Sequence, residues 1–424
     1  MTRVKAHIFI ALSLVFLLFS DSAFALLEEC PESNPNAPSP KKIAIFTDGT
    51  GNTKDDQTNV YRLYELTTRQ ASNIPGIITY YDRGVGNLGT KVSGGAVGLG
   101  LSRNVRQAYR CLADHYQPGD QIYLFGFSRG AYTARVLGGL IHLMGVLDFP
   151  AGLSKKDQRQ MVEDLYDIYK KNGDEEFEQL RQQFQVDHKM HHPEIEVMGV
   201  WDTVAALGLS PMREKLHETC VRSGVLGWFE SLFDKDEEEC LLEAASTRLY
   251  QDYHRIGVEG IRKIYHAVSI DERRNAFKIE LYDETEIQSG QVLKQVWFSG
   301  VHSDVGGGYE DSAALAGITL NWMIGNLRDE DLLPAGVQVE EAFNGPMHTS
   351  YKSFYKKVDP RIRDIKPGSF VHISVLQRMV NPVSNPNPER EPQGRYRPVQ
   401  FEACLKGREP TKEIMSDCYQ LVGD

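Results

Sequence analysis

Nothing in this sequence of 424 residues has the spacing of a metal or nucleotide site. No Cys-x-x-Cys pair occurs among its six cysteines, so a structural zinc site is not indicated. The segment 49–53, GTGNT, superficially resembles a phosphate-binding loop, but no Gly-Lys-Ser/Thr follows it. Basic residues are also in deficit: the formal net charge is −11, and an acidic surface repels phosphate backbones. We therefore expect no cofactor, no metal and no nucleic-acid partner.

The N-terminus differs in pattern from the rest of the chain. Arg3 and Lys5 precede an apolar run, residues 8–19, and the small-residue segment 22–25 (SAFA) follows. A basic start, a short apolar core and an Ala-x-Ala end are typical of a cleavable signal peptide. We predict cleavage after Ala25 and export to the periplasm or the medium. An uncleaved anchor helix is the alternative, although the run is short for a membrane span.

An exported chain with an even number of cysteines is expected to form disulfides. All six cysteines lie beyond the predicted cleavage point. Proximity in sequence suggests the pairs Cys220–Cys240 and Cys404–Cys418, but sequence alone leaves the connectivity open.

Residues 26–40 are rich in proline and asparagine and are predicted to be a linker. Mostly apolar segments of strand length follow, separated by stretches typical of helices, as in a mainly parallel sheet with helices on both faces. The expected strands are 42–47, 77–81, 121–125, 195–201, 263–269 and 292–298; the expected helical stretches include 101–115, 132–144 and 154–185.

We expect one catalytic domain over residues 41–345, with a C-terminal extension, 346–424, packed on the same domain. Two helical insertions interrupt the pattern. Residues 148–192 are highly charged, which favours a solvated helical excursion. Residues 207–260 carry apolar side chains at helical spacing, which fits either a helix packed on the core or a lid that touches membrane.

The segment 126–130, GFSRG, directly follows an apolar strand and directly opens a helical run. A strand-to-helix turn at this point must be sharp, and it forces Ser128 into a strained conformation that projects its hydroxyl. Gly126 and Gly130 are needed because a Cβ there would collide with the neighbouring strand or helix. The position of GFSRG between a strand and a helix, more than the five residues themselves, predicts a nucleophilic serine.

A serine hydroxyl needs a base, and the base needs an acid to hold it. In doubly wound hydrolases these follow the serine in the order acid, then histidine, at the ends of later strands. Asp202 follows the strand 195–201 and His302 follows the strand 292–298, so both fit. His372 is the rival histidine, and Asp304 the rival acid.

The oxyanion formed in such a reaction needs two N–H donors. The N–H of Arg129, directly after the nucleophile, is the first candidate. The second is expected from Gly49 or Thr50, in the loop after the first strand. Asp48 in that loop either orients its backbone or is a plain turn residue.

The segments FTDGTGN, YYDRGVGN, PGDQIYLFGFSRGAYTAR, GVWDTVAALG, YHAVSIDERRNAF and WFSGVHSDVGGGY stand in this order. Together they closely resemble, over residues 42–323, an α/β-hydrolase domain long catalogued as of unknown function, which also forms the catalytic part of type VI secretion phospholipase effectors. The resemblance implies an α/β-hydrolase fold, a triad on Ser128, Asp202 and His302, and phospholipid acyl esters as substrate. The predicted signal peptide departs from injected effectors, so a secreted or housekeeping esterase fits as well as a toxin.

The sequence thus predicts a serine hydrolase that acts on a lipid or a small ester, with transient contact to a membrane surface. Two alternatives stay open. One is a metal-dependent phosphoesterase with Asp48, Asp202, His302 and Asp304 as ligands, and the other is a non-catalytic binding module on a hydrolase fold. Acyl chain, head group and oligomeric state are not indicated.

Overall fold

The computed structural model describes residues 30–32, 38–84, 94–204, 257–274, 277–350, 361–383 and 395–423. The chain divides into two units, 1–32 and 33–424, and the second contains every helix and strand of the described residues. The predicted signal peptide, the Cys220–Cys240 pair and the insertion 207–260, apart from its last four residues, lie outside the described residues.

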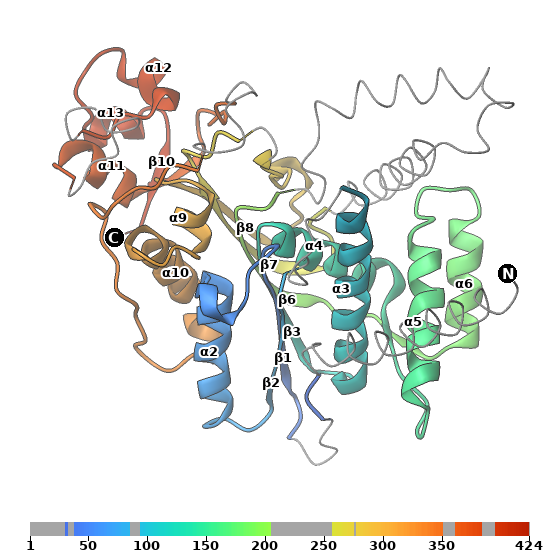
Figure 1. Cartoon of the computed structure of the whole chain (residues 1–424). Helices are drawn as coiled ribbons and strands as arrows, with labels where there is room; N and C mark the ends of the chain where they lie inside the picture. Colours follow the sequence, from blue (N-terminus) through green and yellow to red (C-terminus); the bar gives the residue numbers. More distant parts are fainter. Residues whose placement is uncertain are drawn as a thin grey trace, which may run out of the picture. The chain divides into compact units, whose positions relative to one another are not determined.

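Within the described residues, eight parallel strands form one sheet in the order β10-β9-β8-β7-β6-β3-β1-β2 (Figure 1). The chain leaves β1 for β2 on one side and returns for β3 on the other, which creates a switch point between β1 and β3. The strands are β1 (Lys42–Thr47), β2 (Ile77–Asp82), β3 (Gln121–Phe127), β6 (Ile195–Trp201), β7 (Ile261–Ser269), β8 (Val292–Phe298), β9 (Phe370–His372) and β10 (Gln420–Val422).

The six strands expected from sequence are confirmed, with ends that move by at most two residues. Their apolar runs are buried on both faces: all of β1 after Lys42 and all of β3 after Gln121 are buried. Phe46 pairs in register with Phe125 and stacks on it, so aromatic rings pack side by side on β1 and β3. Burial on both faces explains why these strands lack polar alternation.

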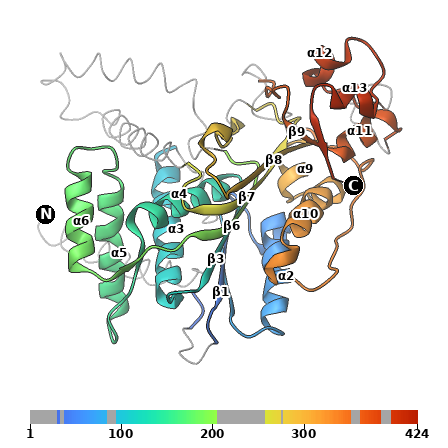
Figure 2. The ribbon, with the colours of Figure 1, turned by 180° about the vertical axis from the view of Figure 1, so that it is seen from behind.

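Helices cover both faces of the sheet (Figures 1 and 2). On one face lie α2 (Asn59–Ala71), α9 (His302–Gly306) and α10 (Ala314–Asn326), and on the other α3 (Gly94–His115), α4 (Arg129–Met144) and α5 (Lys155–Tyr169). The predicted fold class, α/β-hydrolase-like with a parallel sheet and helices on both faces, is therefore observed.

The charged segment 148–192 forms α5 and α6 (Phe177–Asp187). Tyr166, Tyr169 and other side chains on one face of α5 are buried, and the opposite face is exposed. The segment leaves through β4 (Val146–Leu147) and returns through β5 (Met190–His191), which pair antiparallel. It is thus a helical excursion, as its charge pattern predicts.

The C-terminal part of the chain continues the sheet, because β9 pairs with β8 and β10 pairs with β9. The predicted disulfide Cys404–Cys418 is confirmed. Within the described residues, no helix is both long enough and apolar enough to cross a membrane. The remaining elements are α11 (Ile373–Val380), α12 (Glu402–Leu405), α13 (Lys412–Ser416) and the 3-10 turns Lys54–Asp56, Glu284–Glu286, Arg328–Glu330 and Val399–Phe401.

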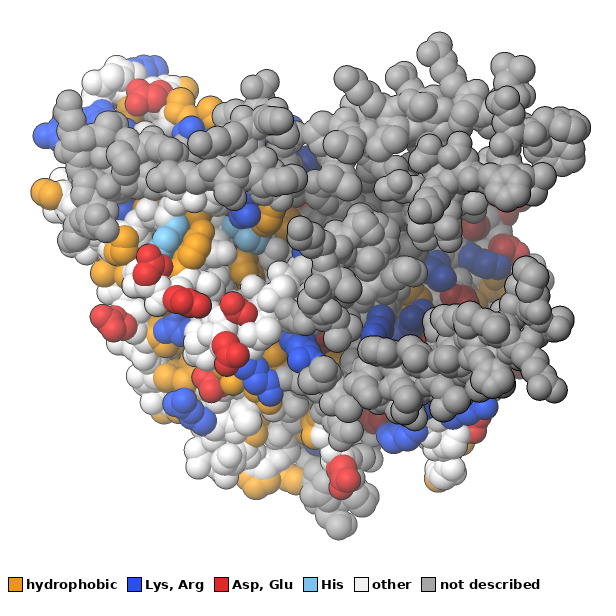
Figure 3. All heavy atoms as spheres, viewed as in Figure 1, with side chains coloured by type: hydrophobic (Ala, Val, Ile, Leu, Met, Phe, Trp, Pro, Cys, Tyr) orange, Lys and Arg blue, Asp and Glu red, His pale blue; other side chains and the backbone are white. Residues whose placement is uncertain are grey.

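Acidic and basic side chains are interspersed over the described part of the face in Figure 3. The net charge of −11 is therefore not gathered in one acidic region on that face.

Candidate active site

Ser128 stands at the turn between β3 and α4. Its backbone has φ 59° and ψ −125°, a conformation that L residues rarely adopt. Two glycines let the turn close: a Cβ on Gly130 would lie 2.1 Å from the Thr47 carbonyl oxygen, and one on Gly126 would lie 2.6 Å from the Cα of Ala131. A strained turn between a strand and a helix is expected of a nucleophilic serine.

The side chains of Ser128, His302 and Asp202 meet at the carboxyl ends of β3, β8 and β6. The Nε2 of His302 lies 2.8 Å from the Oγ of Ser128. Its Nδ1 lies 2.5 Å from the Oδ2 of Asp202. All three residues are buried. The structure therefore brings the three predicted residues into one hydrogen-bonded row in the order serine, imidazole, carboxylate.

Asp202 lies directly after β6 and has a positive φ of 42°. Its Oδ1 accepts hydrogen bonds from the Ser269 N–H at 2.8 Å and from Arg363 at 2.6 Å. Burial opposes the ionisation of this carboxyl, but the charge of Arg363 and the bond with His302 outweigh it, so the pKa of Asp202 lies below its ordinary value. The carboxyl is thus held ionised.

Burial lowers the pKa of the His302 imidazole, and the bond to Asp202 offsets only part of this effect. The imidazole is therefore neutral at neutral pH, the form that accepts a proton. The backbone N–H of His302 donates to Glu272, a buried residue that also pairs with Arg274. Glu272 thus fixes the start of α9, on which the imidazole stands.

The loop after β1 lies against the nucleophile, because a Cβ on Gly49 would come within 3.2 Å of the Cβ of Ser128. The Gly49 N–H donates to Asp48 at 2.7 Å, whereas the Thr50 N–H donates to none of the described residues. Arg129 opens α4, so its N–H lies at the positive end of the helix dipole. Of the two predicted second donors, the geometry favours Thr50 over Gly49.

Asp48 is an organising residue of this loop. Its Oδ2 accepts hydrogen bonds from Thr58 at 2.6 Å and from Tyr81 at 2.8 Å, while its Oδ1 holds Gly49. Burial raises the pKa of Asp48, and these bonds offset part of the rise. Of the two roles open in the sequence, orientation of the loop backbone is the one that these contacts support.

The other two secondary candidates lie outside the serine–imidazole–carboxylate row. Asp304 accepts hydrogen bonds from the Val301 and His348 N–H groups and pairs with the His348 ring. His372 bonds Ser374 and stacks on Phe298. Arg363 and Glu272 were not anticipated as site residues. Glu272 lies within the segment YHAVSIDERRNAF, which marks the family resemblance but no role for this carboxyl, and no motif surrounds Arg363.

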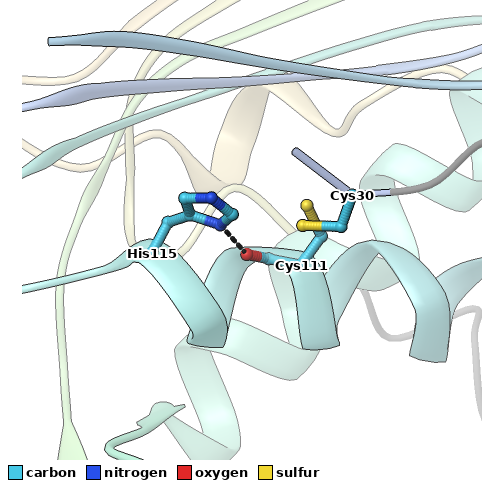
Figure 4. Close-up of side chains that lie close together, drawn as sticks. All are labelled: Cys30, Cys111 and His115. Atoms are coloured by element: carbon cyan, nitrogen blue, oxygen red, sulfur yellow. Dashed lines mark hydrogen bonds between the residues drawn. The ribbon is translucent and has the colours of Figure 1, made fainter. Parts of the chain in front are cut away.

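The side chains proposed above as metal ligands do not converge. In the described residues, no three of Asp48, Asp202, His302 and Asp304 bring donor atoms within 4.8 Å of one another. Elsewhere, Figure 4 shows Cys111 and His115 on neighbouring turns of α3, where His115 Nδ1 bonds the Cys111 carbonyl at 2.8 Å. Cys111 is disulfide-bonded, so it offers no thiolate to a metal.

This chain is similar to a known protein family and to a curated protein. The family model described as "T6SS, Phospholipase effector Tle1-like, catalytic domain" matches residues 41–326. The Saccharomyces cerevisiae protein "Uncharacterized protein YEL023C" is 28% identical over 267 residues, which are 56% of this chain and 32% of that protein. The chain therefore spans about a third of the length of this curated relative.

Two solved structures are also similar. The Tle1 effector bound to the VgrG spike of the type 6 secretion system is 18% identical, with a TM-score of 0.32 over 65% of this chain and 52% of that one. The native esterase Est2 of the planctomycete Thermogutta terrifontis is 16% identical, with a TM-score of 0.36 over 73% of this chain and 89% of that one.

Proposed function

This chain belongs to the family of Tle1-like phospholipase effector catalytic domains of type VI secretion, and we propose that it is a serine hydrolase of the α/β-hydrolase class. In this proposal it cleaves acyl esters of phospholipids with Ser128, His302 and Asp202. The observation that carries the proposal is the row of hydrogen bonds from Ser128 Oγ through His302 to Asp202. The strained turn at Ser128 supports it, because such strain gathers at reacting groups.

In the proposed reaction the Oγ of Ser128 attacks the ester carbonyl carbon while His302 Nε2 takes the hydroxyl proton. The carbonyl oxygen becomes an oxyanion, which the N–H groups of Arg129 and Thr50 stabilise. As the intermediate collapses, the carbon–oxygen bond to the alcohol breaks and His302 returns the proton to the leaving alcohol. A water molecule then cleaves the acyl-serine by the same steps and releases a carboxylic acid.

Asp202 takes no proton in this scheme. It holds the Nδ1 side of the imidazole, which leaves Nε2 facing Ser128, and its negative charge stabilises the imidazolium that forms. The low pKa of Asp202 supports this role, because only the ionised carboxyl provides that charge.

Family membership supports the lipid substrate, and transient contact with a membrane surface is part of the proposal because acyl esters of phospholipids lie in membranes. We further propose export by the N-terminal signal peptide to the periplasm or the medium. The domain boundaries predicted from sequence, with the three reacting residues within 41–345, belong to the same proposal.

The test combines labelling and product analysis. One sample of purified protein is treated with a fluorophosphonate probe. A second, untreated sample is incubated with panels of phospholipids and short-chain esters, and the products are identified by mass. Ser128→Ala should abolish labelling and lower turnover by about 10⁴–10⁶-fold. Ser102→Ala, at a buried serine on α3, is the matched control and should keep both activities.

The same experiment separates the rival functions. Loss of activity with a chelator, combined with resistance to the fluorophosphonate, would favour a metal-dependent phosphoesterase. A folded protein that neither labels nor cleaves any ester would favour a non-catalytic binding module. Near-full esterase activity of Ser128→Ala would overturn the assignment of the nucleophile.

A further inference from the structure

We infer that Arg363, which lies beyond the residues matched by the family model, is a positioning residue for the proposed triad and acts through Asp202. The inference rests on the proposed function. It extends the catalytic unit into the C-terminal part of the chain, because residues 41–326 alone do not include this arginine.

The guanidinium of Arg363 grips both oxygens of the Asp202 carboxylate. Nη1 donates to Oδ1 at 2.6 Å and Nη2 donates to Oδ2 at 3.1 Å. The Oδ2 atom is the one that faces His302. A two-pronged contact of this kind fixes the plane of the carboxylate, which a single bond does not do. Arg363 therefore sets the direction from which the acid meets the imidazole.

Arg363 is itself held in place by the protein. Nη1 also donates to the carbonyl oxygen and the Oγ of Ser269, at 2.8 and 2.6 Å, and Nη2 donates to the Phe277 carbonyl oxygen at 2.9 Å. Ser269 is the last residue of β7, next to β6 in the sheet. Only 6% of Arg363 is exposed. The guanidinium is thus anchored to the end of the sheet instead of to solvent.

The charge of Arg363 counts as well as its shape. Asp202 is fully buried, and burial without a cation favours the neutral carboxylic acid. A neutral Asp202 would give no electrostatic stabilisation to the imidazolium. The positive charge of Arg363 also weakens the electrostatic attraction between the Asp202 carboxylate and the His302 imidazolium. A neutral carboxylic acid, however, would provide no such attraction. The net effect of Arg363 therefore favours catalysis.

A second contact links the same C-terminal part to the histidine loop. Tyr396 donates its hydroxyl to the Oδ2 of Asp271 at 2.7 Å, and this oxygen also accepts the N–H of Gly300 at 2.8 Å. Gly300 lies two residues before His302. Arg363 and Tyr396 thus support both the acid and the base.

The test is the pH dependence of kcat/KM for a p-nitrophenyl ester in the full-length protein. Arg363→Met should lower kcat/KM at neutral pH by on the order of 10–100-fold. It should also move the acid limb to higher pH, because Asp202 then takes up a proton in the range where the enzyme works. A loss by the same factor at every pH would show a merely structural role and overturn the inference.

Arg363→Lys keeps the positive charge and loses the bidentate contact of the guanidinium with Asp202. It should leave the acid limb near that of the wild type while kcat falls, and it serves if Arg363→Met does not fold. If Arg363→Lys kept the kcat of the wild type, the claim that the bidentate contact positions Asp202 would be overturned. Arg378→Met removes another buried arginine of the same C-terminal part, one that bonds backbone carbonyls, and should not move the limb.

A double-mutant cycle shows whether Arg363 acts through Asp202. In an Asp202→Asn background, Arg363→Met should cost little more, since the group it positions is already lost. Additive losses would overturn the inference. If wild-type protein is neither labelled by the fluorophosphonate nor active, the proposed function fails; if it is both and Arg363→Met matches its pH profile, only this inference fails.

Discussion

The ring of Phe127 lies 4.6 Å from the imidazole of His302, measured between ring centroids. Phe277 meets the same imidazole edge-on at 4.8 Å. Gly306 makes room for this packing, since a Cβ there would lie 2.0 Å from the Phe127 ring. Phe127, which precedes the nucleophile, and Phe277 thus shield the imidazole from water. This burial lowers the pKa of His302.

The burial of His302 by these two phenylalanine rings predicts the pH dependence of the reaction. The neutral imidazole is the active base, so kcat/KM should fall as pH falls through the pKa of His302, with a midpoint below the ordinary 6.5. Phe277→Ala admits water and should move the midpoint upward toward 6.5. The control Phe184→Ala, at a buried phenylalanine on α6, should leave it in place. A midpoint that Phe277→Ala leaves unchanged would show that the ring does not shield the base.

Gly130 should be intolerant of any side chain. A Cβ at this position would meet the carbonyl oxygens of Thr47 and Asp48 at 2.1 and 2.4 Å, so β1 and α4 would have to separate. We expect Gly130→Ala to lower the free energy of unfolding by about 1–3 kcal/mol or more, and to disable Ser128. Urea unfolding and fluorophosphonate labelling measure the two effects.

Gly325 provides the matched control, because it lies in α10 and a Cβ there meets nothing within 4 Å. Gly325→Ala should be neutral or raise stability by up to about 1 kcal/mol, the gain in helix propensity. Equal effects of the two substitutions would contradict the steric account of the turn.

The sequence predicted the site better at its local features than at its long-range ones. The turn at Ser128 is visible because strand, glycines and helix are contiguous, and strand ends with the right order point to Asp202 and His302. Arg363 meets Asp202 across 161 residues, and nothing beside it in sequence marks that contact. Strands β9 and β10 have three residues each, too few for a hydrophobic pattern. Contacts between residues that only the tertiary fold brings together leave no periodic pattern in the sequence.

The disulfide Cys404–Cys418 should stabilise the C-terminal edge of the sheet. It closes a loop of sequence separation 14, for which the loss of chain entropy in the unfolded state is worth about 3 kcal/mol. The double variant Cys404→Ala/Cys418→Ala should therefore unfold at lower urea concentration. Below that transition it should keep its esterase activity, since neither cysteine contacts the triad. Unchanged unfolding would mean that the bridge adds no constraint.

His348 should make stability depend on pH. Its Nδ1 lies 2.5 Å from Asp304 and its Nε2 lies 2.9 Å from Asp311, while its ring stacks on Tyr309. Burial lowers the pKa of His348, but the two carboxylates outweigh it, so the folded-state pKa lies above 6.5. The stabilisation is then fully present below the unfolded-state pKa of 6.5 and is lost as pH rises through the folded-state value.

His348→Gln should therefore lower the free energy of unfolding by on the order of 1 kcal/mol in acid, where the imidazolium hydrogen bonds exist, and by less in alkali. Urea unfolding of both proteins at about pH 5.5 and about pH 9 measures the difference. His188→Gln is the control, because the Nδ1 of His188 bonds the Phe184 carbonyl instead of a carboxylate. A larger loss at the alkaline pH would reverse the sign of the linkage and show that His348 contacts Asp304 as a neutral ring.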